Sequence, residues 1–69
     1  MHIIINGEER KFDGDSFSLL VLVEQLGAKP ERVAIELNRN IVARELWRDT
    51  ILADGDRLEI VHFVGGGSR

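Results

Sequence analysis

The sequence has no cysteine and only one proline. Without cysteine the chain cannot form a disulfide framework, a zinc knuckle or a thiol nucleophile. A domain of 69 residues that lacks such cross-links must fold by packing alone. Because this composition suits a reducing compartment, we expect a cytoplasmic protein.

Long apolar runs and an excess of basic charge are also missing. The longest apolar run, Leu19 to Val23, is far too short to span a membrane. Residues 1–6 lack both the basic leader and the long apolar stretch of a signal peptide. The formal net charge of −3 argues against bulk nucleic-acid binding. We therefore expect neither a membrane nor a nucleic acid as a partner.

What is present is the composition of one small globular domain. Hydrophobic residues make up 43% and charged residues 30%, which is ordinary for a folded domain and too apolar for disorder. A chain this short buries only about 60% of its unfolded surface, so its core is thin. We do not expect a deep substrate cavity, and neither the serines nor the paired carboxylates form the pattern of an enzyme.

The first third of the chain predicts a β-hairpin followed by a helix. Ile3 and Ile5 share one face of a strand, and Asn6-Gly7 is a strong hairpin turn signal. The return strand runs to about residue 13 and points Phe12 toward the core. Apolar residues at helical spacing then predict a helix from an N-cap at Ser18 to Leu26, ended by the glycine that follows.

The rest of the chain predicts further strands around a single helical turn. The strands cover residues 33–38, 41–43 and 58–64, and the turn covers residues 45–49. The first and last strands can pair in parallel at the sheet centre, since a long crossover joins them. We thus expect an α+β fold, a mixed sheet of four to five strands with one main helix on one face. Trp47 is predicted to form a partly buried lid on the small core.

The most informative segment is the glycine run Gly65-Gly66-Gly67, which follows the last strand. Glycines cannot pack, but a thread without side chains can enter a channel too narrow for any Cβ. A carboxylate at the end of such a thread is a reactive group on a flexible arm. The alternative is a frayed terminus. We divide the chain into a folded domain, residues 1–64, and a tail, residues 65–69.

Apolar residues that the core does not need stand directly before this tail. Val61 and Phe63 share one strand face, and we predict that they form a docking patch for a partner, to which His62 and Val64 contribute. Leu20 and Val21 also lie outside the apolar stripe of the helix and are candidates for an interface. No histidine has a second ligand at metal-binding spacing, so we expect no metal site.

These features resemble those of a known family over essentially the whole chain. The chain is similar to the sulfur carrier proteins of thiamine biosynthesis, the ThiS family, which are ubiquitin-like β-grasp domains. The resemblance rests on Ile5-Asn6-Gly7, on the terminal glycines, and on segments 22–26, 33–38, 41–47, 52–56 and 58–61.

The resemblance implies a function as a protein co-substrate rather than as an enzyme. A ubiquitin-activating-like adenylyltransferase is expected to adenylate the C-terminal glycine carboxylate. A persulfide sulfur donor then displaces AMP, and the resulting thiocarboxylate donates sulfur to thiazole synthase. The chain itself is expected to bind no cofactor, because ATP and magnesium belong to the activating enzyme.

One departure from the family concerns the end of the chain. Family members usually end in glycine, whereas here Ser68 and Arg69 follow Gly67. We favour removal of both residues by a protease, which makes Gly67 the reactive residue and Gly65 and Gly66 its thread. A cloning remnant, or a chain that is not a conventional carrier, are the alternatives.

Other functions are compatible with the same residues. A carrier of this kind can serve another pathway, such as molybdopterin or amino-acid biosynthesis, by the same mechanism with a different acceptor. A non-catalytic ubiquitin-like binding module or modifier, with an inert or isopeptide-forming tail, is the alternative from a different class.

Overall fold

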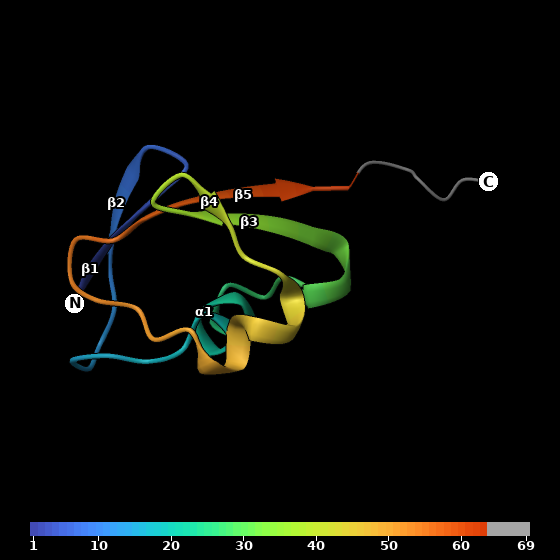
Figure 1. Ribbon diagram of the computed structural model, residues 1–69. Coiled ribbons are helices and arrows are strands. Elements are labelled where there is room, and N and C mark those ends of the chain that lie inside the picture. Colours follow the sequence, from blue (N-terminus) through green and yellow to red (C-terminus); the bar gives the residue numbers. More distant parts are fainter. Residues whose placement is uncertain (64–69) are drawn as a thin grey trace.

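A mixed five-stranded sheet forms one layer of the computed structural model, which describes residues 1–63 (Figure 1). The strand order is β2-β1-β5-β3-β4. The strands are β1 (His2–Ile5), β2 (Glu8–Lys11), β3 (Val33–Leu37), β4 (Asn40–Ile41) and β5 (Arg57–His62). Strands β1 and β5 pair in parallel and the other neighbours are antiparallel, which confirms the expected crossover and the expected α+β sheet.

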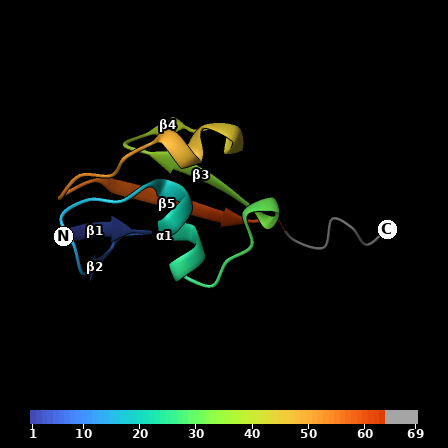
Figure 2. The same cartoon turned by 90° about the horizontal axis from the view of Figure 1, so that it is seen from below.

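The main helix, α1 (Leu19–Gln25), lies on one face of this sheet (Figure 2). It begins as predicted, because the Ser18 Oγ accepts the Val21 N–H at 3.2 Å. It ends at the C-cap Leu26, after which Gly27 takes a φ of +79°.

Two 3₁₀ helices complete the secondary structure. One, η2 (Arg44–Asp49), replaces the predicted helical turn and extends it by one residue. The other, η1 (Pro30–Arg32), was not predicted. Proline suits the first turn of a helix, because no intrahelical partner awaits its missing N–H and its φ is already helical.

The core lies between the sheet and the helices. Its ten buried side chains come from β1, α1, β3, β5, η2 and the segment that follows η2: Ile3, Ile5, Leu19, Leu22, Val23, Val33, Ile35, Trp47, Leu52 and Leu58.

The prediction of a partly exposed lid at Trp47 is wrong. The side chain is only 1% exposed, and its Nε1 donates a hydrogen bond to the Val42 carbonyl at 2.9 Å. The 3₁₀ winding of η2 against α1 turns the indole inward, and the nearby carbonyl satisfies its one polar atom.

Several strands are shorter than predicted because turns begin earlier. Strand β2 ends at Lys11, although Phe12 packs against the core as expected. Strand β3 ends before Asn38 and Arg39, whose φ values of 51° and 73° belong to a turn. The predicted end of the last strand, Val64, lies outside the described residues.

Candidate functional site

The alternation of side chains along β5 gives the strand two different faces. Leu58 is fully buried beneath α1 and Ile60 is half-buried beside it. Val61, on the face that α1 does not cover, is 59% exposed. The Phe63 N–H donates to the Arg32 carbonyl at 2.9 Å, so the pairing of β5 with the β3 segment continues one residue past the end of each strand. This continuation carries Phe63, which is 56% exposed, to the same open face.

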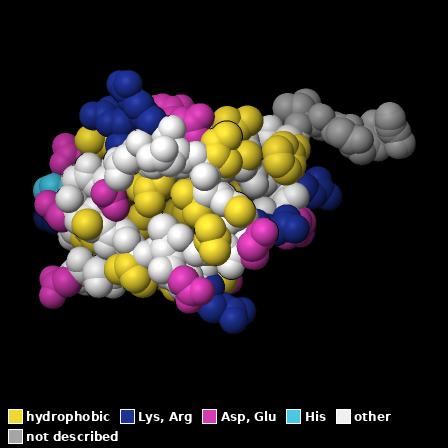
Figure 3. Space-filling model, in the orientation of Figure 1, with side chains coloured by type: hydrophobic (Ala, Val, Ile, Leu, Met, Phe, Trp, Pro, Cys, Tyr) yellow, Lys and Arg dark blue, Asp and Glu magenta, His cyan; other side chains and the backbone are white. Residues whose placement is uncertain are grey.

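Neighbouring strands add apolar side chains to this open face. A shallow depression of about 200 Å³ is lined by Ala34, Ile35, Glu36, Ile41, Glu59 and Val61. We define the open-face patch as Ala34, Ile41, Val61 and Phe63. Exposed hydrophobic side chains gather on the upper side of Figure 3, toward the end of β5. The sequence did not single out Ile41, which is 77% exposed because its two-residue strand lies at the sheet edge opposite Glu36.

The register of β3 against β5 also places two carboxylates beside the patch. Ala34 lies opposite Val61, and Glu36 lies opposite Glu59. Like charges directly opposite each other on neighbouring strands destabilise a sheet. Among residues 1–63 the one close contact between a basic and an acidic side chain joins His2 Nδ1 and Glu9 Oε2 at 3.1 Å. Neither Glu36 nor Glu59 therefore has an ion-pair partner within the described part of the chain. The open-face patch is therefore apolar with an acidic border.

The residues predicted to contact a partner do not all share one face. His62 points to the α1 side of the sheet, where it lines a groove with Asn6, Arg10 and the end of α1. Val61 and Phe63 lie on the open face. The other predicted site residues, Val64 and the three glycines Gly65, Gly66 and Gly67, lie outside the described residues, as do Ser68 and Arg69. The roles of all these residues stay predictions.

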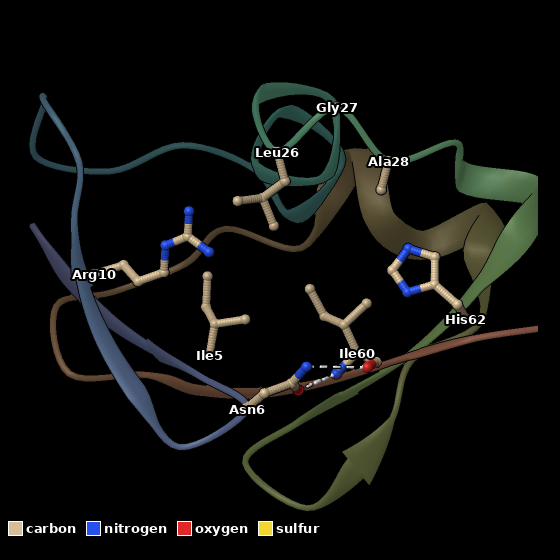
Figure 4. A pocket seen from close by; sticks show the side chains of 8 residues that line it. All are labelled: Ile5, Asn6, Arg10, Leu26, Gly27, Ala28, Ile60 and His62. Carbon is tan, nitrogen blue, oxygen red and sulfur yellow. Dashed lines mark hydrogen bonds between the residues drawn. The ribbon is translucent and has the colours of Figure 1, made fainter.

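Asn6 holds β5 in place where β1 has ended. The Ile60 N–H donates to Asn6 Oδ1 at 2.7 Å, and Asn6 Nδ2 donates to the Ile60 carbonyl at 3.2 Å (Figure 4). The side chain thus replaces the backbone neighbour that β1 no longer provides beyond Ile5. Sequence reasoning recognised Asn6 only as a turn residue, and its φ of 51° confirms that part.

The other polar features of the described residues have structural explanations. Asp56 Oδ2 accepts the Ala53 N–H at 2.8 Å, a bond within its own turn. Asp54 Oδ1 accepts the His2 N–H at 2.7 Å, and this bond ties the turn to the first strand. Within residues 1–63 no group of three or more histidine or carboxylate side chains could hold a metal ion. In the same part of the chain, no helix has the length and apolarity needed to cross a bilayer.

The class follows from the arrangement of the described elements: a mixed sheet with a parallel central pair and one main helix across one face is a ubiquitin-like β-grasp domain. The family model described as "ThiS family" matches residues 3–67. The chain belongs to the ThiS family.

Relatives and solved structures agree with this assignment. The chain is 35% identical over 63 residues to the sulfur carrier protein ThiS of Bacillus subtilis, covering 91% of this chain and 96% of that protein. A crystal structure of the thiamine biosynthesis protein (ThiS) from Geobacter metallireducens is 36% identical, with a TM-score of 0.85 over 97% of this chain and all of that one.

Another relative is much longer than this chain. A thiazole synthase of Paramagnetospirillum magneticum is 44% identical over 68 residues, which are 99% of this chain and 21% of that protein. The chain thus spans about a fifth of the length of this relative, and the same holds for a thiazole synthase of Magnetococcus marinus.

Proposed function

We propose that this protein is the sulfur carrier for the thiazole moiety of thiamine. The observation that carries the proposal is the position of the open-face patch, which ends in the chain at Phe63, one residue short of the glycine run of a ThiS-family sequence. A carrier needs a reactive terminus on a segment without side chains, and a nearby surface to which a partner can bind. The sequence supplies the thread and the fold supplies the surface.

The chemistry of the proposed cycle follows from the poor reactivity of a carboxylate. An oxygen of the Gly67 carboxylate attacks the α-phosphorus of ATP and releases pyrophosphate, so that AMP becomes a leaving group. The terminal sulfur of a persulfide donor attacks the acyl carbon and displaces AMP, which forms an acyl disulfide. A thiol then cleaves the S–S bond that came from the persulfide. The products are a glycyl thiocarboxylate and a disulfide on the donor side. ATP and magnesium belong to the adenylyltransferase in this scheme.

Two observations support the proposed partners. Thiazole synthases that contain a stretch similar to this whole chain support thiazole synthase as the acceptor. The border of Glu36 and Glu59 around apolar side chains suits a partner that presents an apolar contact next to a lysine or arginine. We assign that contact to the activating adenylyltransferase, which must hold the domain while the tail reaches its nucleotide.

The proposal places the reactive residue at Gly67 after removal of Ser68 and Arg69. The match to the family model stops at Gly67, which supports trimming at that point. An arginine side chain at the terminus is too bulky for a channel that admits only glycine. We expect the 69-residue chain to be inactive and the Gly67-terminated chain to be active.

The test compares these two forms with the cognate activating enzyme. With magnesium and ATP, the Gly67-terminated form should exchange pyrophosphate, and the 69-residue form should not. Adding a persulfide donor should then replace oxygen by sulfur at the terminus, as seen by intact mass. Equal exchange rates for the two forms would overturn the role of trimming, and no exchange by the trimmed form would overturn the carrier function in favour of a binding module. Sulfur transfer to a different acceptor would indicate another pathway.

A further inference from the structure

A groove on the α1 side of the sheet is not explained by the proposed chemistry. It encloses about 270 Å³ between the end of α1 and strands β1, β2 and β5 (Figure 4). Its lining consists of Ile5, Asn6, Arg10, Leu26, Gly27, Ala28, Ile60 and His62. The apolar members form its walls, while Arg10 and His62 stand at opposite ends in Figure 4.

The size of the groove suits a side chain better than a metabolite. Small-molecule sites enclose about 300–1,000 Å³ and bury most of the ligand. This groove lies below that range and is open to solvent along the lining residues Asn6, Arg10 and His62, which are exposed. A single aliphatic or aromatic side chain from another protein fills such a space and anchors an interface.

The charge of the groove differs from that of the rest of the molecule. The chain carries a net charge of −3, yet no aspartate or glutamate lines this groove. Arg10 is its one fixed charge, and within residues 1–63 the guanidinium takes part in no ion pair. Glu8 shares a face of β2 with Arg10 but lies outside the lining. The groove therefore complements an apolar group that has a carboxylate next to it.

The place of the groove links it to the tail. His62, at one end of the groove, stands only three residues before Gly65 in the sequence, so a partner seated in the groove contacts the chain close to the glycine run. Asn6, in the middle, holds the Ile60 backbone and keeps the groove wall in register with the strand.

We propose that this groove is a second docking surface, which takes an apolar side chain flanked by a carboxylate from a partner protein. The proposal extends the carrier function and rests on it, because a carrier is handled by more than one partner. It gives the domain two docking surfaces on opposite faces of the sheet. The open-face patch has an acidic border, whereas the groove has a basic one.

A purely structural role for Arg10 makes a different prediction. Arginine stems often cover apolar surface while their charged heads stay in water, and Arg10 lies opposite Ile3 of the core. If that were its whole role, removing its charge would change stability and leave recognition of acidic groups unaltered. Arg10→Gln and Lys11→Gln form a matched pair, because both remove one positive charge from β2, but Lys11 lies on the open face opposite His2.

The test uses two synthetic peptides and the isotope-labelled 69-residue protein. The peptides are acetyl-Glu-Leu-Glu-amide and acetyl-Gln-Leu-Gln-amide, titrated into the protein while backbone amide shifts are recorded by NMR. We expect the acidic peptide to give saturable shifts at Ile5, Ile60 and His62 and to bind about threefold more tightly than the neutral peptide. Arg10→Gln should abolish that preference, and Lys11→Gln should preserve it.

The contrary results are equally defined. The proposal is wrong if the peptides bind alike, if the shifts fall on Glu59 and Val61 of the open face, if no saturable shifts occur, or if both variants behave alike. The titration uses no activating enzyme, so its failure is distinguishable from failure of the carrier function, which pyrophosphate exchange measures. If the trimmed chain is never adenylated, the carrier function is wrong. The peptide titration then still decides whether the groove prefers an apolar side chain flanked by carboxylates.

Discussion

The two faces of the sheet follow different rules although one strand, β5, contributes to both. On the α1 side Leu58 and Ile35 are buried in the core. On the open face Val61 and Ile41 remain exposed, and Glu36 lies opposite Glu59. The first face is what packing requires of a small domain. The open face leaves apolar side chains in contact with water and places two like charges opposite each other. Neither feature stabilises the isolated chain. The difference is what the proposed contact between the open face and a partner would require.

The largest expected effect separates the two faces directly. Leu58→Ala should lower the free energy of unfolding by about 2–5 kcal/mol, because it leaves a cavity in a core that is already thin. Val61→Ala, three residues on and on the open face, should change it by less than about 0.5 kcal/mol. Urea denaturation of both variants measures the contrast. Equal losses would show that the open face is packed as tightly as the core.

The next largest effect concerns the hydrogen bonds between the Asn6 side chain, in the turn between β1 and β2, and the Ile60 backbone of β5. Asn6→Ala should cost about 1–3 kcal/mol of unfolding free energy, since the Ile60 N–H and carbonyl both lose their partner. Asn6→Asp keeps the acceptor for the N–H and should cost less. Hydrogen exchange at the Ile60 amide provides the local readout. Unchanged protection in Asn6→Ala would mean that the pairing with β3 holds β5 at Ile60 without the Asn6 side chain.

The open-face patch provides a prediction in which stability and recognition diverge. Phe63→Ala should leave the free energy of unfolding within about 0.5 kcal/mol of the parent, because the ring is exposed. It should weaken binding to the activating enzyme by about tenfold, as truncation of an aromatic anchor does. Thermal denaturation and isothermal titration calorimetry check the two halves. A large loss of thermal stability with normal affinity would contradict the assignment.

The smallest effect should have the opposite sign. Glu59→Gln removes the repulsion with Glu36 and should stabilise the fold by up to about 0.5 kcal/mol, while weakening the activating-enzyme complex. Glu45→Gln is the control, because it removes the same charge from an exposed site on η2. A gain in stability that both variants share would reflect net charge and not the cross-strand pair.

Much of the architecture was predictable because local signals carry it. The cap at Ser18 and the positive φ of Asn6, Gly7 and Gly27 are properties of short segments, and they lie where the sequence predicts them. The parallel pairing of the first and last strands also follows from the element order. The prediction of a partly buried lid at Trp47 was wrong, because the sequence of one helical turn does not reveal which of its sides faces the core. The 3₁₀ helix at Pro30 was not predicted, because a proline shortly after a helix can mark either the end of that helix or the start of a new one.

The candidate site was predictable only in part. Val61 and Phe63 could be found because alternation marks them as apolar residues on one strand face. Ile41 could not, since it becomes their neighbour only through the pairing of three strands. Alternation along β5 also places His62 on the face opposite to Val61 and Phe63. The groove that His62 lines with Arg10 could not be predicted, because these two residues are more than fifty positions apart in the sequence.

By itself the sequence determined the family, the order of elements and the glycine end to which the proposed chemistry is assigned, because these depend on residue types and on spacing along the chain. Only the tertiary structure decided that Trp47 is a core residue, that Asn6 clamps β5, and that acidic and basic borders lie on opposite faces of one sheet. Strand register decides such matters, since a shift of one residue would exchange every side chain between the two faces.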